Sequence, residues 1–410
     1  MLFSMSFITA YSYNRIVRES WSGSEERIDM NKSKVALVRC DTYDDEKVYK
    51  STRSGLELLG GIARFAKPGE RIVLKPNVLI GSKPEKSVTT HPAVFKAVGR
   101  LFKEAGASIS YGDSPSFGKC EPNMRKSGLK QAGDELELSL ADFDSGRSVS
   151  HKDALLVKSF VIANGVLDSD GLVSLPKLKT HPLPRFTGAV KNQFGCIPGL
   201  LKGQYHVKLP DPYDFCTMLV DLNTLVKPRL CVMDGIMAME GNGPRGGKPK
   251  KMSVLLLSSD PIAIDATACR IIDLDPEAVP TSRAGEKARL GTYHSENIEI
   301  VGEAIESFLD RSFEVIRTPP SPCTRSRLRT FVKNRICEKP VIDEGKCTKC
   351  GICVKMCPVE PKAVDWHTGD KSRSPTYKYD RCIRCFCCQE NCPEGAVFVE
   401  SPMLGRIFFH

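Results

Sequence analysis

The most constraining feature of this 410-residue chain is a cysteine pattern that occurs twice near its C-terminus. The first copy, CTKCGICVKMCP, supplies Cys347, Cys350, Cys353 and Cys357. The second copy, CIRCFCCQENCP, supplies Cys382, Cys385, Cys388 and Cys392. Each of these cysteines in the second copy follows its counterpart by 35 positions, and a proline follows each quartet. The two copies are therefore an internal repeat with the spacing C-x2-C-x2-C-x3-C-P.

This spacing is typical of ligands to [4Fe–4S] clusters, in which three closely spaced thiolates hold one cluster and the fourth reaches the other. Zinc is the alternative, because paired C-x2-C units also bind zinc tetrahedrally. Zinc ribbons, however, use cysteine pairs, whereas triplets recur here with a fourth cysteine and a proline at a fixed offset. We therefore predict two [4Fe–4S] clusters. Cluster one takes Cys347, Cys350, Cys353 and Cys392, and cluster two takes Cys382, Cys385, Cys388 and Cys357.

Residues 341–400 accordingly resemble a bacterial-type two-[4Fe–4S] ferredoxin domain, which implies a small α+β fold. The tails AVDW and AVFV predict a short strand after each quartet. The 24-residue stretch from Pro358 to Arg381 departs from the pattern, and we interpret it as an exposed loop between the two halves. The extra cysteine, Cys387, is interpreted as a small apolar side chain beside a cluster. The alternatives for Cys387 are a reactive thiol and a ligand of a rearranged cluster.

Seventeen cysteines, nine of them in the last 64 residues, favour metal ligation in a reducing compartment. No Lys or Arg precedes the apolar opening MLFSMSFITAYSY, which argues against a secretory signal and for a cytoplasmic protein. No apolar run reaches the ~18 residues that a transmembrane helix needs. Residues 1–33 carry little pattern, and MNKSKVALVRC suggests that Met30 is the natural start.

The net charge of +10 is concentrated in one segment. Seven Lys or Arg residues and one acidic residue lie between Arg317 and Lys339. We interpret residues 311–340 as a basic linker or helix, and its apolar stripe would be Leu328, Phe331, Val332 and Ile336. A nucleic-acid or anionic-membrane surface is the alternative. The lack of interleaved aromatic residues and of a nucleic-acid-binding fold argues against nucleic acid. Residues 401–410 are a short tail.

Residues 34–310 alternate short apolar segments with segments of helical periodicity. The predicted strands are 35–39, 71–76, 107–113, 172–176, 229–234 and 252–258, and the clearest helices are 91–106, 211–226 and 260–274. Nearly continuous apolar strands that alternate with helices predict an α/β domain with a mostly parallel sheet. Ligands of such sheets bind beyond the carboxyl ends of the strands.

Polar residues gather where these strands end, and we predict that they form a substrate site. They are Lys75, Asn77, Lys177, Lys179, His181, Lys191, Asn192, Asp234 and Gly243. Converging lysines suit a small anionic substrate, and the glycine-rich turn around Gly243 would let backbone amides approach it. The alternatives are solvated lysines and a simple tight turn. The turn has neither P-loop nor Rossmann order, and no catalytic residue is identified.

Several of these segments together resemble the domain-of-unknown-function 362 family. They are KPN at 75–77, TTHPAV at 89–94, LPKLKTH at 175–181, VKNQFG at 190–195, MDGIMAMEGNGP at 233–244 and DPIAIDATA at 260–268. The resemblance covers most of residues 35–305. Because members often carry a C-terminal ferredoxin module, it implies the two-domain architecture, and it implies no established reaction.

Three functions fit the two halves. In the first, the clusters pass low-potential electrons from a donor or redox partner protein to an anionic substrate or cofactor on the α/β domain. The module has ten basic and nine acidic residues from residue 341 onward, which favours a tethered relay over a freely diffusing acidic ferredoxin. In the second, the protein is an electron-transfer or assembly accessory whose large domain docks a protein partner. In the third, it is a non-redox transferase or ligase with structural clusters.

Overall fold

The computed structural model describes residues 32–321, 334 and 337–402. The expected start at Met30, the apolar stripe of the basic segment and most of the C-terminal tail lie outside these residues. No helix in the described part of the chain is long and apolar enough to cross a membrane.

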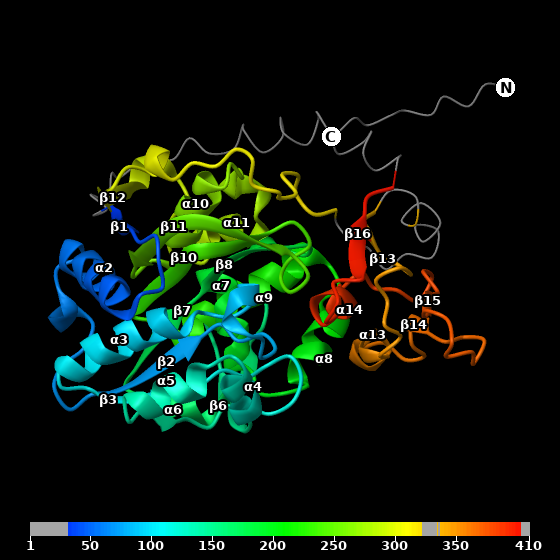
Figure 1. Cartoon of the computed structure of the whole chain (residues 1–410), viewed down its shortest axis with the longest axis horizontal. Helices are drawn as coiled ribbons and strands as arrows, with labels where there is room; N and C mark the ends of the chain where they lie inside the picture. Colours follow the sequence, from blue (N-terminus) through cyan, green and yellow to red (C-terminus); the bar gives the residue numbers. More distant parts are fainter. Residues whose placement is uncertain (1–31, 322–333, 335–336, 403–410) are drawn as a thin grey trace. The chain divides into compact units, whose positions relative to one another are not determined.

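A ten-stranded mixed sheet forms the centre of the large domain (Figure 1). Its main path runs β12-β1-β11-β10-β7-β2-β3-β4, and β8 and β9 extend it beside β10. The strands are β1 (Ser33–Arg39), β2 (Arg71–Pro76), β3 (Ser108–Tyr111), β4 (Ser139–Leu140), β7 (Gly171–Leu175), β8 (Lys177–His181), β9 (Arg185–Thr187), β10 (Leu230–Glu240), β11 (Lys248–Ser258) and β12 (Ile298–Gly302). Most strand pairs are parallel, whereas β11 runs antiparallel to both β1 and β10, and β8 to β9. The predicted α/β fold with a mostly parallel sheet is confirmed.

Helices connect and cover these strands. They are α2 (Asp45–Leu58), α3 (Pro92–Glu104), α4 (Cys120–Lys126), α5 (Leu129–Glu135), α6 (Asn164–Leu167), α7 (Ala189–Asn192), α8 (Leu201–Lys208), α9 (Pro212–Val226), α10 (Pro261–Ile271) and α11 (Pro280–Lys287). A polar N-cap followed by proline starts α3, α9 and α10, with His91, Asp211 and Asp260 as the caps. A separate hairpin pairs β5 (Gly146–Ser150) with β6 (Ser159–Ala163).

The strands next to the candidate site form the core because their residues are apolar on both faces. Val232, Leu255 and Leu257 have no exposed surface, and Leu172 and Val173 of β7 are also buried. Buried parallel strands of this kind place their polar residues at the ends. The carboxyl ends of β2, β3, β7 and β8 therefore carry the side chains from which the site is built.

The small domain contains two antiparallel strand pairs and two short helices. The pairs are β13 (Lys339–Ile342) with β16 (Val397–Glu400), and β14 (Val364–Asp365) with β15 (Thr376–Tyr377). The helices are α13 (Ile352–Met356) and α14 (Cys387–Glu390). Strands β14 and β16 arise from AVDW and AVFV, as the sequence predicts.

Candidate functional site

The repeated cysteines surround two separate cavities in the small domain. The first is lined by Cys347, Cys350, Cys353 and Cys392. The second is lined by Cys382, Cys385, Cys388 and Cys357. Each cavity thus combines three cysteines of one copy with the fourth of the other, which is the arrangement that the crossed pairing of two clusters requires.

The backbone turns around both cavities in the same way. Lys349 and Arg384 have φ values of 59° and 62°, and Gly351 and Phe386 have values of 74° and 60°. Lys349 corresponds to Arg384 and Gly351 to Phe386, each 35 residues further along the chain. In each copy a short helix begins directly after the second of these residues. These left-handed residues bend the chain so that successive cysteines face one cavity, although only glycine adopts this conformation without cost.

The cysteines surround each cavity rather than converge on a point. Within residues 32–321, 334 and 337–402, no group of three or more His, Cys, Asp or Glu side chains is placed to hold a single metal ion. A cubane fits this geometry, because each of its four thiolates binds a different iron atom. A donor set made only of sulfur suits an iron–sulfur centre and also zinc, so the separation of the cysteines around each cavity is the observation that favours a cubane.

The second copy of the repeat holds the module against the large domain through its polar residues 389–391. Gln389 Nε2 donates hydrogen bonds to Asn242 Oδ1 (2.7 Å) and to the carbonyl of Gly243 (2.8 Å). Asn391 Oδ1 accepts one from Ser116 Oγ (2.7 Å). Arg245 Nη1 donates to the carbonyl of Asn391. The first copy has Val-Lys-Met at the equivalent positions, so its helix cannot make these contacts.

The glycine-rich turn between β10 and β11 takes part in this contact. Asn242 Nδ2 donates to the carbonyls of Gly395 (3.2 Å) and Val397 (3.0 Å). A Cβ atom on Gly246 would lie 2.7 Å from Gly395 Cα, so the two backbones approach closely only because both residues are glycine. The predicted site residue Gly243 thus contacts the iron–sulfur module, and it does not line the main cavity described next.

A cavity of about 540 Å³ lies where the two domains meet. Five predicted site residues line it, namely Asn77, Lys179, His181, Lys191 and Asn192. From the module, Lys355, Lys362, Cys357, Cys387 and Glu390 line it. Because Cys357 also lines the second cysteine cavity, that cavity and the main cavity share a wall. A ligand in the main cavity would therefore lie beside this cysteine cavity.

Lys179 brings a buried amine to the cavity wall. Its Nζ donates to Asn77 Oδ1 (2.6 Å) and to the carbonyl of Val88 (2.6 Å), both of which are neutral acceptors. Burial lowers the pKa of Lys179 to about 7, and the charge of nearby Lys177 contributes to the shift. Lys179 is therefore near its titration point at neutral pH, and an anion in the cavity would favour its charged form.

His181 and Glu390 form a close contact across the domain boundary. His181 Nδ1 accepts the Leu183 N–H (3.0 Å), which leaves the ring proton on Nε2, and Nε2 lies 2.7 Å from Glu390 Oε1. Neither atom makes a well-aligned hydrogen bond with any described residue. Burial lowers the pKa of His181 to about 4, so the ring is neutral. Burial acts to raise the pKa of Glu390, but Lys191 and His181 hold that pKa well below its usual range.

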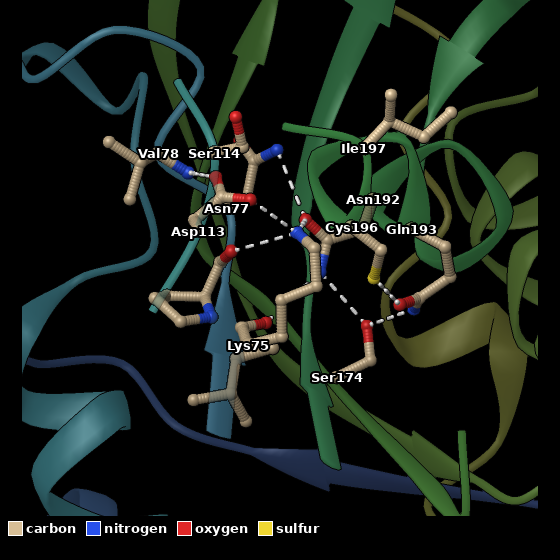
Figure 2. A network of polar contacts seen from close by, with 12 residues as sticks. Lys75, Asn77, Val78, Asp113, Ser114, Ser174, Asn192, Gln193, Cys196 and Ile197 are labelled. Atoms are coloured by element: carbon tan, nitrogen blue, oxygen red, sulfur yellow. Dashed lines mark hydrogen bonds and ion pairs between the residues drawn. The ribbon is translucent and has the colours of Figure 1, made fainter. Parts of the chain in front are cut away.

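Three other predicted site residues form buried ion pairs instead of lining the cavity. Lys75 Nζ lies 2.6 Å from Asp113 Oδ1 and donates to Asn192 Oδ1 at 3.2 Å, as Figure 2 shows. Lys177 Nζ lies 2.7 Å from Asp234 Oδ2 and 2.9 Å from the Tyr43 hydroxyl. Both lysines are fully buried, so each needs its carboxylate partner to offset the cost of desolvation.

The structure adds lining residues that the sequence reasoning missed. They are Asp113 and Ser114 after β3, Lys202 and His206 of α8, and Glu390. The GDS sequence at the end of β3 could have pointed to the first two residues, because polar residues follow a strand there as they do after β2. Helix α8 has only eight residues and gave no clear periodicity, so nothing in the sequence singled out Lys202 or His206.

Substituting Gly195 by alanine should destabilise the fold beneath the cavity. A Cβ atom there would lie 1.8 Å from Asp113 Oδ1 and 2.7 Å from Lys75 Nζ, so it would push the ion pair apart. We expect a loss of about 1–3 kcal/mol, the usual cost of overpacking, measured by denaturant unfolding. Gly203→Ala is the matched control, because its nearest atom is Pro358 Cβ at 3.8 Å. Equal midpoints for the two variants would contradict this account.

The fold and the two cysteine cavities define a class of protein in which a mostly parallel α/β domain carries a two-cluster iron–sulfur module. Comparison with protein families agrees. Residues 346–396 match the 4Fe-4S dicluster domain, and residues 72–270 match the Domain of unknown function (DUF362). The chain is also 37% identical over 257 residues to the Thylakoid-associated protein sll1697 of Synechocystis sp., an alignment that covers 62% of this chain and 79% of that protein.

The chain belongs to the DUF362 family and carries a C-terminal 4Fe-4S dicluster domain, as its motifs indicated. That domain binds two [4Fe–4S] clusters, so the cofactor prediction is confirmed. A dicluster domain implies electron transfer, whereas the family description assigns no reaction to the α/β domain.

Two solved structures align with part of this chain at low identity. The lactate racemase apoprotein from Thermoanaerobacterium thermosaccharolyticum is 11% identical with a TM-score of 0.36, over 56% of this chain and 54% of that one. A protein from Thermotoga maritima is 14% identical with a TM-score of 0.37, over 57% of this chain and 59% of that one. The chain spans little more than half the length of either structure.

Proposed function

We propose that this protein passes low-potential electrons through its two clusters to an anionic ligand held in the 540 Å³ cavity. The observation that carries the proposal is the composition of the cavity wall. Lys179 and Lys191 line it from the α/β domain, and Cys357 lines it from the module. The lysines supply positive charge for an anion, and Cys357 would bring cluster two next to that anion.

The ligand assignment follows the two cysteine cavities. Cluster one would be held by Cys347, Cys350, Cys353 and Cys392, and cluster two by Cys382, Cys385, Cys388 and Cys357. Cys350 is exposed, whereas three of the four cysteines around cluster two are buried. Electrons would therefore enter from a donor or redox partner at cluster one, pass to cluster two and leave toward the cavity.

The proposed binding site can be tested with anions and lysine variants. Carboxylate and phosphate metabolites would be screened by thermal shift under anaerobic conditions. Lys179→Met and Lys191→Met should each weaken the best ligand by about 1.5–3 kcal/mol, the range for a hydrogen bond to a charged group. Iron content should be unchanged, because neither residue is a proposed cluster ligand. The proposal fails if no anion stabilises the protein or if both variants bind like the wild type.

Anion binding should weaken as the pH rises through about 7. Lys179 has a pKa near this value, and only its protonated form carries the charge that attracts an anion. Glu390 and Asp113 raise this pKa, and Lys177 and Lys191 lower it. His181, with a pKa of about 4, stays neutral through the same range. Calorimetric titrations at several pH values would check this. Burial also lowers the pKa of Lys202 in the same cavity to about 7, so Lys179→Met should reduce the pH dependence and Lys202 would account for the remainder. A profile unaltered by Lys179→Met would refute this role.

A further inference from the structure

The buried lysines around the cavity fall into two groups. Lys75 and Lys177 each lie within 2.7 Å of a carboxylate, and neither lines the cavity. Lys179 and Lys202 both line the cavity, and within the described residues their ammonium groups donate to neutral oxygens. Because the fold neutralises the first group, the second group is the one left to meet charges from outside the chain.

Lys202 and Ser114 form a second cationic position. Lys202 is 9% exposed, and its Nζ donates to Ser114 Oγ (2.7 Å) and to the carbonyl of Ile197 (2.8 Å). An ammonium group has three donors, so one N–H remains. Ser114 Oγ also accepts the Gly199 N–H (2.8 Å). Ser114 Oγ accepts both of these hydrogen bonds and donates none to a described residue, which leaves the hydroxyl hydrogen available to a ligand. Ser114 is 4% exposed and lines the same cavity.

The two cationic positions lie at opposite ends of a chain of polar contacts. Lys179 bonds to Asn77, and Asn77 Nδ2 donates to Asn192 Oδ1 at 3.3 Å. Lys75 bonds to that same oxygen and pairs with Asp113, the neighbour of Ser114 (Figure 2). Lys179 and Lys202 share no partner among these contacts. The charged residues in the chain of contacts between them, Lys75 and Asp113, form an ion pair and add no net charge.

An aromatic side chain, that of Phe194, also lines the cavity. Its ring lies 5.3 Å from Lys191 Nζ and packs edge to face against His206, with ring centroids 5.8 Å apart. The next residue, Gly195, accepts the Ser114 N–H through its carbonyl (3.0 Å). The cavity wall thus offers an aromatic surface, besides its polar groups, to the uncharged part of a ligand.

We propose that the cavity binds a ligand with two acidic groups joined by an apolar segment, with one group at Lys202 and Ser114 and the other at Lys179 and Lys191. This rests on the proposed function, because it names the class of anion that the cavity takes. A ligand with a single acidic group would engage only one position and leave the other buried amine with neutral partners.

Calorimetry on the full-length protein with its clusters tests the proposal. The probes are the linear dicarboxylates from malonate to suberate and the monocarboxylates of matching length from propionate to octanoate. One dicarboxylate should bind roughly tenfold or more tightly than its matched monocarboxylate, the gain from one charged hydrogen bond. Lys202→Met should remove that gain, so that the dicarboxylate binds no more tightly than its matched monocarboxylate. Comparing the affinity of phosphoglycolate with that of glycolate tests whether the second acidic group is a phosphate. Tighter binding of phosphoglycolate to the wild type, but not to Lys202→Met, would support the proposal.

Matched variants separate this proposal from the proposed function. Lys251→Met changes an exposed lysine that does not line the cavity and should retain the dicarboxylate preference. Ser114→Ala carries the test if Lys202→Met loses iron or stability. If monocarboxylates bind through Lys179 and no dicarboxylate binds more tightly than its matched monocarboxylate, the proposal of a ligand with two acidic groups is wrong. The proposed function would still hold. If neither class nor the phosphorylated probe binds, both fail.

Discussion

Replacing Cys388 by serine should remove about half of the iron, whereas replacing its neighbour Cys387 should remove none. The anaerobically purified protein should hold about eight irons and eight sulfides, as two cubanes require. Cys388 lines the second cysteine cavity. Cys387 lines the main cavity and no other described one. The adjacent thiols therefore differ in what they face, and only the loss of Cys388 deprives a cluster of a ligand.

Iron and sulfide analysis with the visible absorption of the clusters would measure this difference. The two variants are matched, because each replaces one buried cysteine of α14 by serine. Equal iron loss from both variants would make Cys387 a ligand and overturn the assignment. Near-stoichiometric zinc without iron in the wild type would reject the cluster chemistry altogether.

Replacing Lys177 by methionine should destabilise the protein by about 3–5 kcal/mol, the usual cost of leaving a buried charge without its partner. Asp234 is fully buried, and its charge is offset by Lys177 at 2.7 Å. The Tyr43 hydroxyl (2.9 Å) and the His91 N–H (3.0 Å) also donate to Asp234, but both donors are neutral groups. They cannot replace the lost positive charge.

Chemical denaturation of three variants would check this expectation. Lys34→Met breaks the exposed pair with Glu299 and should hardly change the free energy of unfolding. Adding Asp234→Asn to Lys177→Met removes the stranded charge and keeps an acceptor for its neighbours, so part of the lost stability should return. A Lys177→Met loss no larger than that of Lys34→Met would show that the pair is not required.

The two [4Fe–4S] clusters could be predicted from the sequence because the ligand spacing is local. Four repeated cysteines and a proline lie within twelve residues in each copy, so the spacing alone indicates the ligand pattern. The mostly parallel sheet was also predictable, because its strands are apolar runs flanked by amphipathic helices. The N-caps at His91 and Asp260 were likewise local signals of a polar cap followed by proline.

The sequence did not show which strand-end lysines form buried ion pairs and which line the cavity, because this depends on partners that are distant in sequence. Lys177 and Lys179 are two residues apart in β8, yet only Lys177 meets a carboxylate, that of Asp234. The segment CIRCFCCQENCP was interpreted only as a source of cluster ligands. Its residues 389–391 also hold the module against the α/β domain, which the sequence analysis did not predict. Comparison with Val-Lys-Met of the first copy would have exposed that difference.

The most direct test of the central claim is a single-turnover experiment under anaerobic conditions. The protein is reduced chemically, excess reductant is removed, and the anion identified by screening is added while cluster absorption is followed. If the cavity ligand accepts electrons from cluster two, the clusters should reoxidise, and the ligand should gain as many electrons as the clusters lose. Lys191→Met should slow this step at subsaturating ligand. Clusters that stay reduced while the ligand is demonstrably bound would contradict electron delivery to the cavity.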